Sequence, residues 1–348
     1  MKASPDPAGL TERLARLIDT DGPISVAHYM AEANAHYYAA RDPLGQAGDF
    51  TTAPEISQMF GELAGLWLAD LWQRAGEPAD ACYVELGPGR GTLAADALRA
   101  MRTAGLRPPV HFVETSPALR KAQRERVPDA NWHDDASTLP EGAPLLVAAN
   151  EFFDALPVRQ LIATEQGWHE MLVAHEAGRF ERVPGPLVPA PLAKAEPGTV
   201  VETSPASVSV VRELAQRLCA QGGAALIFDY GHAHPGTGDT IQAIERHGFA
   251  DPWQRPGSRD VTAHVDFSAL KRAAEDQGAR AFGPTCQGGW LSRMGIDVRA
   301  ALLAKSVPER AGEVEQARVR LTAPDQMGTL FKVMALTAPG WPIPAGFE

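Results

Sequence analysis

Residues 83–93, Tyr-Val-Glu-Leu-Gly-Pro-Gly-Arg-Gly-Thr-Leu, restrict the possible folds of this chain more than any other segment. The part from Tyr83 to Leu86 is apolar enough to be a buried parallel strand. The residues from Leu93 to Met101 carry apolar side chains at helical spacing. A strand, a glycine-rich turn and a helix in this order form the first βα unit of a nucleotide-type α/β fold, whose ligands bind beyond the carboxyl ends of the strands.

The spacing of the glycines restricts the ligand. Position 92 is Thr, so the turn reads Gly-x-Gly-x-Gly and lacks the Gly-x-Gly-x-x-Gly spacing of dinucleotide-binding turns. The sequence contains no Gly-Lys-Ser/Thr, which excludes a phosphate-binding P-loop. A second apolar strand ends at Glu114, whose carboxylate could accept both hydroxyls of a ribose. Such an acid suits NAD equally well, so the glycine spacing decides between the ligands. A glycine turn that binds no ligand is the alternative.

Several sequence blocks carry a family resemblance. Glu85-x-Gly-x-Gly-x-Gly resembles the first motif of class I S-adenosylmethionine (SAM) methyltransferases. Longer blocks are similar to those of the MidA family, which comprises the mitochondrial complex I assembly arginine methyltransferase and its bacterial relatives. These blocks are residues 49–62, 85–93, 114–117, 150–157, 229–231, 260–267 and 287–291. The resemblance covers nearly the whole chain and implies a SAM-dependent methyltransferase with a class I methyltransferase-type doubly wound α/β sheet.

The resemblance assigns the polar groups of SAM to the strand ends. Backbone amides from Gly89 to Thr92 can face the carboxylate of SAM at a helix start. Glu85 is expected near its amino group, and Glu114 at its ribose. Asp135 stands where this fold contacts adenine, although it could instead be a solvated turn acid. The expected cofactor-binding residues are Thr52, Glu85, Gly87, Pro88, Gly89, Gly91, Thr92, Glu114, Asp135 and Asn150.

The acceptor side is expected at Asn150, Glu151 and Asp154, our candidates for catalytic residues. An arginine guanidinium stays protonated, so it is a poor nucleophile until charge is drawn toward its non-reacting nitrogens. Carboxylates that grip those nitrogens can do this, because the guanidinium fork suits bidentate pairing. Better-known arginine methyltransferases also place paired acids after this strand, with a longer spacing. Alternatively, both acids could cap backbone amides in a turn.

Three functions follow from these patterns. The first is a protein arginine methyltransferase whose acceptor, by resemblance, is a subunit of respiratory NADH–quinone oxidoreductase. The second is a non-catalytic SAM-binding assembly factor, and the third is a small-molecule methyltransferase. The block around Glu151 favours an enzyme, because a protein that only binds SAM does not need acids at the position from which the methyl group is transferred.

Composition restricts the partners and the location. The net charge of −11, from 43 acids and 32 bases, argues against a nucleic-acid partner and suits a cationic one. Three scattered cysteines predict neither a disulfide framework nor a zinc site, and His232 and His234 have no third ligand at metal spacing. No run approaches 18 apolar residues and no apolar signal core is present, so we expect a cytoplasmic protein without membrane insertion.

The periodicities predict the domain organisation. We expect an N-terminal helical region over 1–78 and a SAM-binding α/β domain over 79–348, with β-rich insertions at about 157–200 and 231–265. Within the helical region, Pro54 and Glu55 are expected to open a helix whose apolar stripe includes Trp67 and Leu71. The expected insertion strands are 158–162, 168–173 and 179–183, followed by a loop over 184–199. The expected core strands are 82–86, 110–114, 144–149, 224–228 and 330–336, and the expected core helices are 92–104, 117–126, 205–222 and 266–277.

Overall fold

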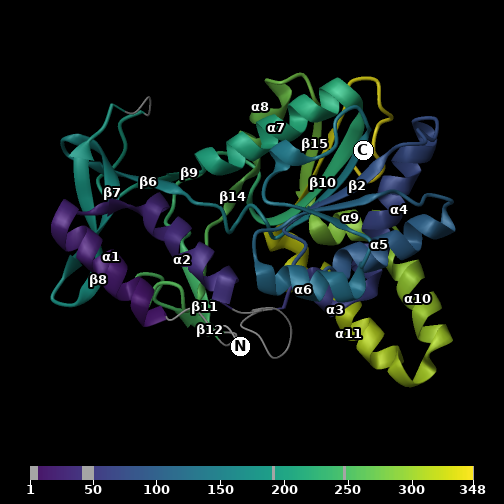
Figure 1. Ribbon diagram of the computed structural model, residues 1–348, viewed down its shortest axis with the longest axis horizontal. Coiled ribbons are helices and arrows are strands. Elements are labelled where there is room, and N and C mark those ends of the chain that lie inside the picture. The colour runs from purple at the N-terminus through teal and green to yellow at the C-terminus, as the bar shows by residue number, and fades with distance from the viewer. Residues whose placement is uncertain (1–6, 41–50, 190–192, 246–247, 348) are drawn as a thin grey trace. The chain divides into compact units, whose positions relative to one another are not determined.

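The computed structural model describes residues 7–40, 51–189, 193–245 and 248–347 (Figure 1). The chain divides into two compact units, which we describe separately. Unit 1 comprises Met1–Phe50, Phe153–Ser209 and His234–Asp266. Unit 2 comprises Thr51–Phe152, Val210–Ala233 and Phe267–Glu348.

Unit 2 is built on a mixed sheet with the strand order β15-β16-β10-β5-β2-β3-β4. The strands from β10 to β4 are parallel, whereas β16 runs antiparallel to both of its neighbours. From β2 the chain proceeds outward to β3 and β4 and then returns to β5 on the other side, which confirms the predicted doubly wound fold class. The strands are β2 (Cys82–Leu86), β3 (Val110–Val113), β4 (Asn131–His133), β5 (Leu145–Asn150), β10 (Gly223–His232), β15 (Arg280–Cys286) and β16 (Phe331–Thr337).

Helices cover both faces of this sheet. Figure 1 shows α4 and α5 on one side of the strands and α7 and α8 on the other. Because both faces are covered, every residue of β2 and of β5 is buried. The helices are α3 (Ala53–Ile56), α4 (Gln58–Arg74), α5 (Thr92–Thr103), α6 (Pro117–Arg126), α7 (Pro205–Gln221), α8 (Phe267–Glu275), α9 (Gln287–Arg293), α10 (Ile296–Ser306) and α11 (Ala311–Thr322). The sequence predicted α5, α6, α7 and α8 but not α9, α10 and α11.

The expected single helix from Pro54 onward is two helices. Ser57, at φ −160° and ψ 139°, is in extended conformation and separates α3 from α4. Its hydroxyl oxygen accepts a hydrogen bond from the amide of Met59 at 3.2 Å, which caps the first turn of α4. The expected apolar stripe of α4 is buried, including Trp67 and Leu71.

The described residues of unit 1 form two helices and two small sheets. Its helices are α1 (Pro7–Asp21) and α2 (Val26–Ala40). A five-stranded sheet has the order β1-β7-β6-β9, with β8 paired to β7, and a three-stranded sheet has the order β12-β11-β13. The strands of these two sheets are β1 (Ile24–Ser25), β6 (Arg159–Thr164), β7 (Gly167–Glu176), β8 (Arg179–Leu187), β9 (Val200–Thr203), β11 (Gln242–Glu245), β12 (Gly248–Ala250) and β13 (Asp260–Thr262). The short strand β14 (Val265–Asp266) belongs to neither of them. The predicted meander is β6 to β8, although β8 continues into the segment that we expected to be a loop.

The helical region that we expected over 1–78 is divided between the two units. Leu14 of α1 and Tyr29 of α2 pack against Val173 and Phe180 of the unit 1 sheet. The apolar side chains of α4 instead pack against strands of the unit 2 sheet. The boundary therefore lies at residue 50, because these helices bury their apolar faces in different cores.

Some expected features lie outside the described residues. These are Asp49 and Phe50, which begin the first family-like block, and residues 1–6, 41–48, 190–192, 246–247 and 348 of the expected regions. Within the described ranges, no helix is both long and apolar enough to cross a membrane.

Candidate functional site

The candidate cofactor residues follow parallel strands at one edge of the unit 2 sheet. In the strand register, Leu86 of β2 is paired with Val113 of β3 on one side and Ala149 of β5 on the other. Gly87, Glu114 and Asn150 therefore begin at the same level, as expected for a site beyond the carboxyl ends of the strands.

The glycine turn needs glycine at all three positions. Gly87, Gly89 and Gly91 have φ values of 60°, 53° and 79°, in the left-handed region that other residues rarely adopt. A Cβ atom on Gly87 would also lie only 2.9 Å from Cδ2 of Phe152. The amide of Gly91 donates to the carbonyl oxygen of Pro88 at 2.7 Å, so this N–H closes the turn. Of the amides that we expected to face the SAM carboxylate, the one at Gly91 is therefore already used.

Glu85 is the penultimate residue of β2 and is buried. Its side chain is only 2% exposed, and Oε2 accepts a hydrogen bond from the hydroxyl of Tyr83 at 2.6 Å. Burial raises the pKa of Glu85 from 4.5 to about 8, although the hydrogen bond from Tyr83 opposes this. A cationic group placed near Glu85 would favour its ionised form, which suits the amino group of SAM.

Glu114 is held by two donors. Its Oε1 accepts from the amide of Ser116 at 2.7 Å, and its Oε2 accepts from Nε2 of Gln123 at 3.2 Å. Burial raises the pKa of Glu114, against these hydrogen bonds. A carboxylate has about four lone-pair sites, so it can accept ribose hydroxyls in addition.

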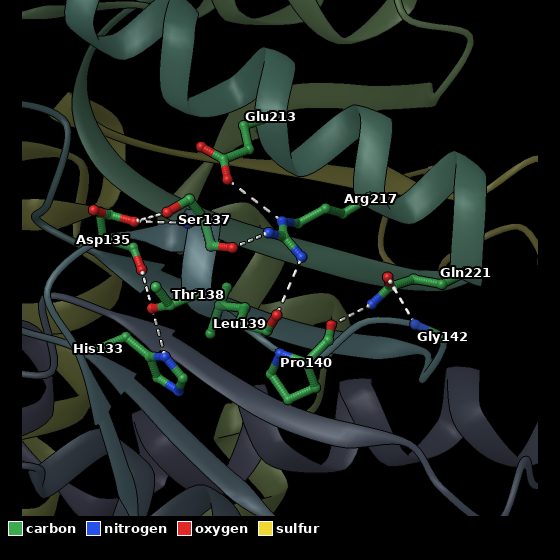
Figure 2. A network of polar contacts seen from close by, with 10 residues as sticks. All are labelled: His133, Asp135, Ser137, Thr138, Leu139, Pro140, Gly142, Glu213, Arg217 and Gln221. Atoms are coloured by element: carbon green, nitrogen blue, oxygen red, sulfur yellow. Dashed lines mark hydrogen bonds and ion pairs between the residues drawn. The ribbon is translucent and has the colours of Figure 1, made fainter.

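Asp135 caps the turn that follows β4. Figure 2 shows its carboxylate directed at Ser137, whose amide donates to Oδ1 at 2.8 Å and whose hydroxyl also donates to Oδ1. These hydrogen bonds lower the pKa of Asp135. The turn is also held from α7, because Arg217 donates to the carbonyl oxygens of Ser137 and Leu139 at 2.8 and 3.3 Å. The contacts of Asp135 are therefore those of the alternative that we considered, a solvated acid in a turn. A contact between Asp135 and adenine stays a prediction.

Asn150 and Glu151 form a small polar group after β5. Glu151 has a φ of 50°, which residues with a side chain seldom adopt and which recurs at functional sites. Its Oε1 accepts from Nδ2 of Asn150 at 3.1 Å and from the amide of Ala53 at 3.2 Å. Asn150 is 9% exposed, and its Oδ1 has no hydrogen-bond partner among the described residues. An acceptor in this state fits a donor from a bound ligand, such as an ammonium or a guanidinium.

Sequence reasoning missed Glu55. Its carboxylate accepts a hydrogen bond from the hydroxyl of Thr92 at the start of α5 and lies 3.8 Å from Nη1 of Arg90. The segment 53–55 therefore contacts two parts of the candidate site. Glu55 contacts the glycine turn, and the amide of Ala53 donates to Glu151. Its presence in the first family-like block was the available signal. Thr52 is buried just before this segment and makes no side-chain capping hydrogen bond.

Asp154 belongs to unit 1 and not to the unit that carries the other candidates. It is buried near Tyr38, whose pKa is raised well above 10 chiefly by burial and further by Asp260 and Asp154. The amide of Ala263 donates to its backbone oxygen at 3.0 Å. Its pairing with Glu151 stays a prediction.

No three His, Cys, Asp or Glu side chains among the described residues lie close enough to hold a metal ion.

Known proteins resemble nearly the whole chain. A family model described as "Putative S-adenosyl-L-methionine-dependent methyltransferase" matches residues 63–285. The mitochondrial protein arginine methyltransferase NDUFAF7 homolog of Drosophila melanogaster is 38% identical over 378 residues, which cover 96% of this chain and 86% of the relative. The mitochondrial protein arginine methyltransferase NDUFAF7 of Homo sapiens is 38% identical over 360 residues, covering 92% and 81%. The crystal structure of a Burkholderia thailandensis protein bound to S-adenosyl-homocysteine is 29% identical, with a TM-score of 0.84, and covers 98% of this chain and 93% of that chain.

Proposed function

This chain belongs to the S-adenosyl-L-methionine-dependent methyltransferase family, and we propose that it methylates arginine side chains of a protein acceptor. Its cofactor is SAM. The relatives named protein arginine methyltransferases support the acceptor class, since they match more than nine tenths of this chain.

The conformation of Glu151 is the observation that carries the proposal. Its left-handed backbone and the two hydrogen bonds to Oε1 hold one carboxylate at the end of β5, beside the glycine turn of β2. An ionised carboxylate here can pair with the guanidinium and draw positive charge away from the nitrogen that attacks the methyl group. The uncommon backbone needs such a reason, because turn capping alone does not require it.

The cofactor occupies the neighbouring strand ends in this proposal. Methyl transfer depends on alignment of the donor sulfonium and the acceptor nitrogen. The glycine turn from Gly87 to Thr92 takes the methionine part of SAM, with Glu85 near its amino group. Glu114 takes the ribose, and Asp135 the adenine. The side-chain oxygen of Asn150 accepts a hydrogen bond from a donor group of SAM or of the arginine substrate, between which it lies in this proposal.

We further propose that the acceptor is a subunit of respiratory NADH–quinone oxidoreductase and that the protein works in the cytoplasm. The MidA-like blocks support the first proposal. Cys82, Cys219 and Cys286 are all free thiols, which supports a reducing compartment.

Replacement of Glu151 tests the acceptor role. Glu151→Gln keeps the shape and one acceptor oxygen but removes the charge that pairs with a guanidinium. We expect SAM affinity to stay within a few-fold of wild type, while methyl transfer to an arginine acceptor falls by about two orders of magnitude, or about 2.7 kcal/mol. Calorimetry with SAM and single-turnover kinetics with labelled SAM measure the two quantities. Glu125→Gln, on an exposed position of α6, is the matched control for the loss of one charge.

Labelled SAM in cell extract, followed by mass spectrometry, identifies the acceptor. Label on a protein arginine supports the proposal. Label only in small molecules, or binding without any transfer, would indicate one of the other two functions. Joint loss of SAM binding and turnover in Glu151→Gln would instead assign Glu151 to the cofactor.

A further inference from the structure

Gln123 of α6 is a fully buried polar residue that connects two parts of the candidate cofactor site. Its side chain is 0% exposed. Its Nε2 donates to the carbonyl oxygen of Gly89 at 2.7 Å and to Oε2 of Glu114 at 3.2 Å. Its Oε1 accepts from the indole Nε1 of Trp132 at 2.8 Å. One amide group therefore joins the glycine turn, the acid after β3 and a side chain of β4.

The chemistry of the partners fixes the orientation of this amide. An indole N–H can only donate, so the Gln123 oxygen must face Trp132. A carbonyl and an ionised carboxylate can only accept, so both N–H groups of Nε2 must face Gly89 and Glu114. A side chain of this length that offers two donors and an acceptor is glutamine alone. Glutamate has no donor when ionised, methionine has none, and lysine has no acceptor.

We infer that Gln123 is a positioning residue for SAM, holding the glycine turn and the Glu114 carboxylate in the arrangement that binds the adenosyl ribose. This rests on the proposed assignment of Glu114 to the ribose hydroxyls. The hydrogen bond to Gly89 fixes the peptide plane between residues 89 and 90. The hydrogen bond to Glu114 leaves the carboxylate one preferred rotamer, so its remaining lone pairs are presented in a fixed direction.

The packing of α6 supports this role. A Cβ atom on Gly91 would lie 3.6 Å from Cα of Gln123, so the backbone of α6 is in close contact with the glycine turn. Ser116 caps α6 by accepting from the amide of Leu119 at 3.3 Å, and its own amide donates to Glu114. The start of α6 and its second turn thus hold the two oxygens of the same carboxylate.

Gln123→Met tests the inference, because methionine is similar in length and lacks both donors. S-adenosyl-homocysteine and its 2′-deoxyribose analogue are the probes, measured by calorimetry. We expect the affinity for S-adenosyl-homocysteine to fall about tenfold to a hundredfold, the usual range for hydrogen bonds to a charged group. The ratio of the two affinities should fall toward one, because an unheld Glu114 discriminates poorly. A general loss of packing would weaken both probes equally and leave that ratio unchanged.

Trp132→Phe is the matched control. It removes the third partner of Gln123 but leaves both donors in place. We expect this variant to keep the wild-type ratio between the probes, since Glu114 and Gly89 keep their hydrogen bonds.

Gln123→Glu keeps the test decisive if the methionine variant does not fold. The introduced carboxylate faces Glu114 and has no donor, so affinity should be low at neutral pH. Protonation at acidic pH removes one negative charge and restores one donor, so affinity should recover relative to wild type at the same pH.

The possible outcomes separate the inference from the proposal on which it rests. If wild type does not discriminate between the probes, the assignment of Glu114 to the ribose is wrong and the inference falls with it. If wild type discriminates and both Gln123 variants keep that ratio, the inference alone is wrong. A reduced ratio in Gln123→Met with an intact ratio in Trp132→Phe supports it, as does recovery of Gln123→Glu at acidic pH.

Discussion

At the residue scale, the acids at strand ends could be predicted because each one follows an apolar run. Glu85, Glu114 and Glu151 all stand where a buried strand meets the ligand edge of the sheet. Gln123 and Glu55 could not be predicted in the same way. Their partners, Gly89 and Thr92, are 34 and 37 residues away along the chain, so only the fold brings them together.

Glu85 gives a prediction about pH and stability. Folding raises the pKa of its carboxyl from 4.5 to about 8, so between these values the folded protein holds a proton that the unfolded chain has lost. This contribution to stability is complete below pH 4.5 and is lost as the pH rises through about 8. The slope for one proton reaches at most about 1.4 kcal/mol per pH unit. Glu85→Gln cannot ionise, so it should lose less stability than wild type over this range.

Urea unfolding of both proteins at several pH values between 4.5 and 8 measures this difference. The free energy of unfolding of Glu85→Gln minus that of wild type should increase with pH, because other titrating groups contribute equally to both. A difference that stays constant over the range would show that Glu85 does not hold the proton.

At the element scale, the crossing of α4 over α5 depends on residues that periodicity does not reveal. The apolar stripe of α4 was predictable, since leucine and tryptophan recur at helical spacing. Its close approach to α5 was not, because Gly61 and Gly65 contribute no side chain to the pattern. A Cβ atom at Gly61 would lie 2.7 Å from Cβ of Asp96. The glycines therefore determine how near the two backbones come.

Gly65→Ala should destabilise the protein although alanine is the better helix former. The added Cβ would lie 2.4 Å from the backbone oxygen of Ala97, and backbone cannot move aside as a flexible side chain can. We expect a loss of about 1–3 kcal/mol, the usual range for overpacking, in urea unfolding. Gly312→Ala in α11 is the matched control, since nothing lies within 4 Å of its Cβ position. That variant should be neutral or gain up to about 1 kcal/mol. Equal effects of the two substitutions would contradict the close crossing.

At the scale of the whole molecule, the sequence predicted two insertions, at about 157–200 and 231–265. It did not predict that these segments belong to one compact unit with the N-terminal residues. Three separate segments, 1–50, 153–209 and 234–266, form unit 1. Hydrophobic periodicity shows which side chains are buried, but not which element buries them. The side chains of α1 therefore gave no sign of their contact with Val173 and Phe180, more than 150 residues later. The doubly wound class of the unit 2 sheet was predictable because glycine turns and parallel strands follow strict connection rules. Its strands β4 and β15 were not among the expected core strands.

The net charge of the whole chain gives the last prediction. At −11 the protein attracts a cationic acceptor, and an arginine guanidinium stays cationic at any accessible pH. Raising sodium chloride from about 0.1 M to about 1 M shortens the Debye length from about 10 Å to about 3 Å. We expect KM for a basic peptide acceptor to rise about tenfold, because screening weakens the encounter. We expect kcat to change little, because Glu151 acts at contact distance, where salt screens least.

The Kd of S-adenosyl-homocysteine, which carries no net charge, is the control and should also change little. A KM independent of salt would show that acceptor capture depends on local contacts alone, whereas a parallel rise in the Kd of S-adenosyl-homocysteine would indicate a general effect of salt on the fold.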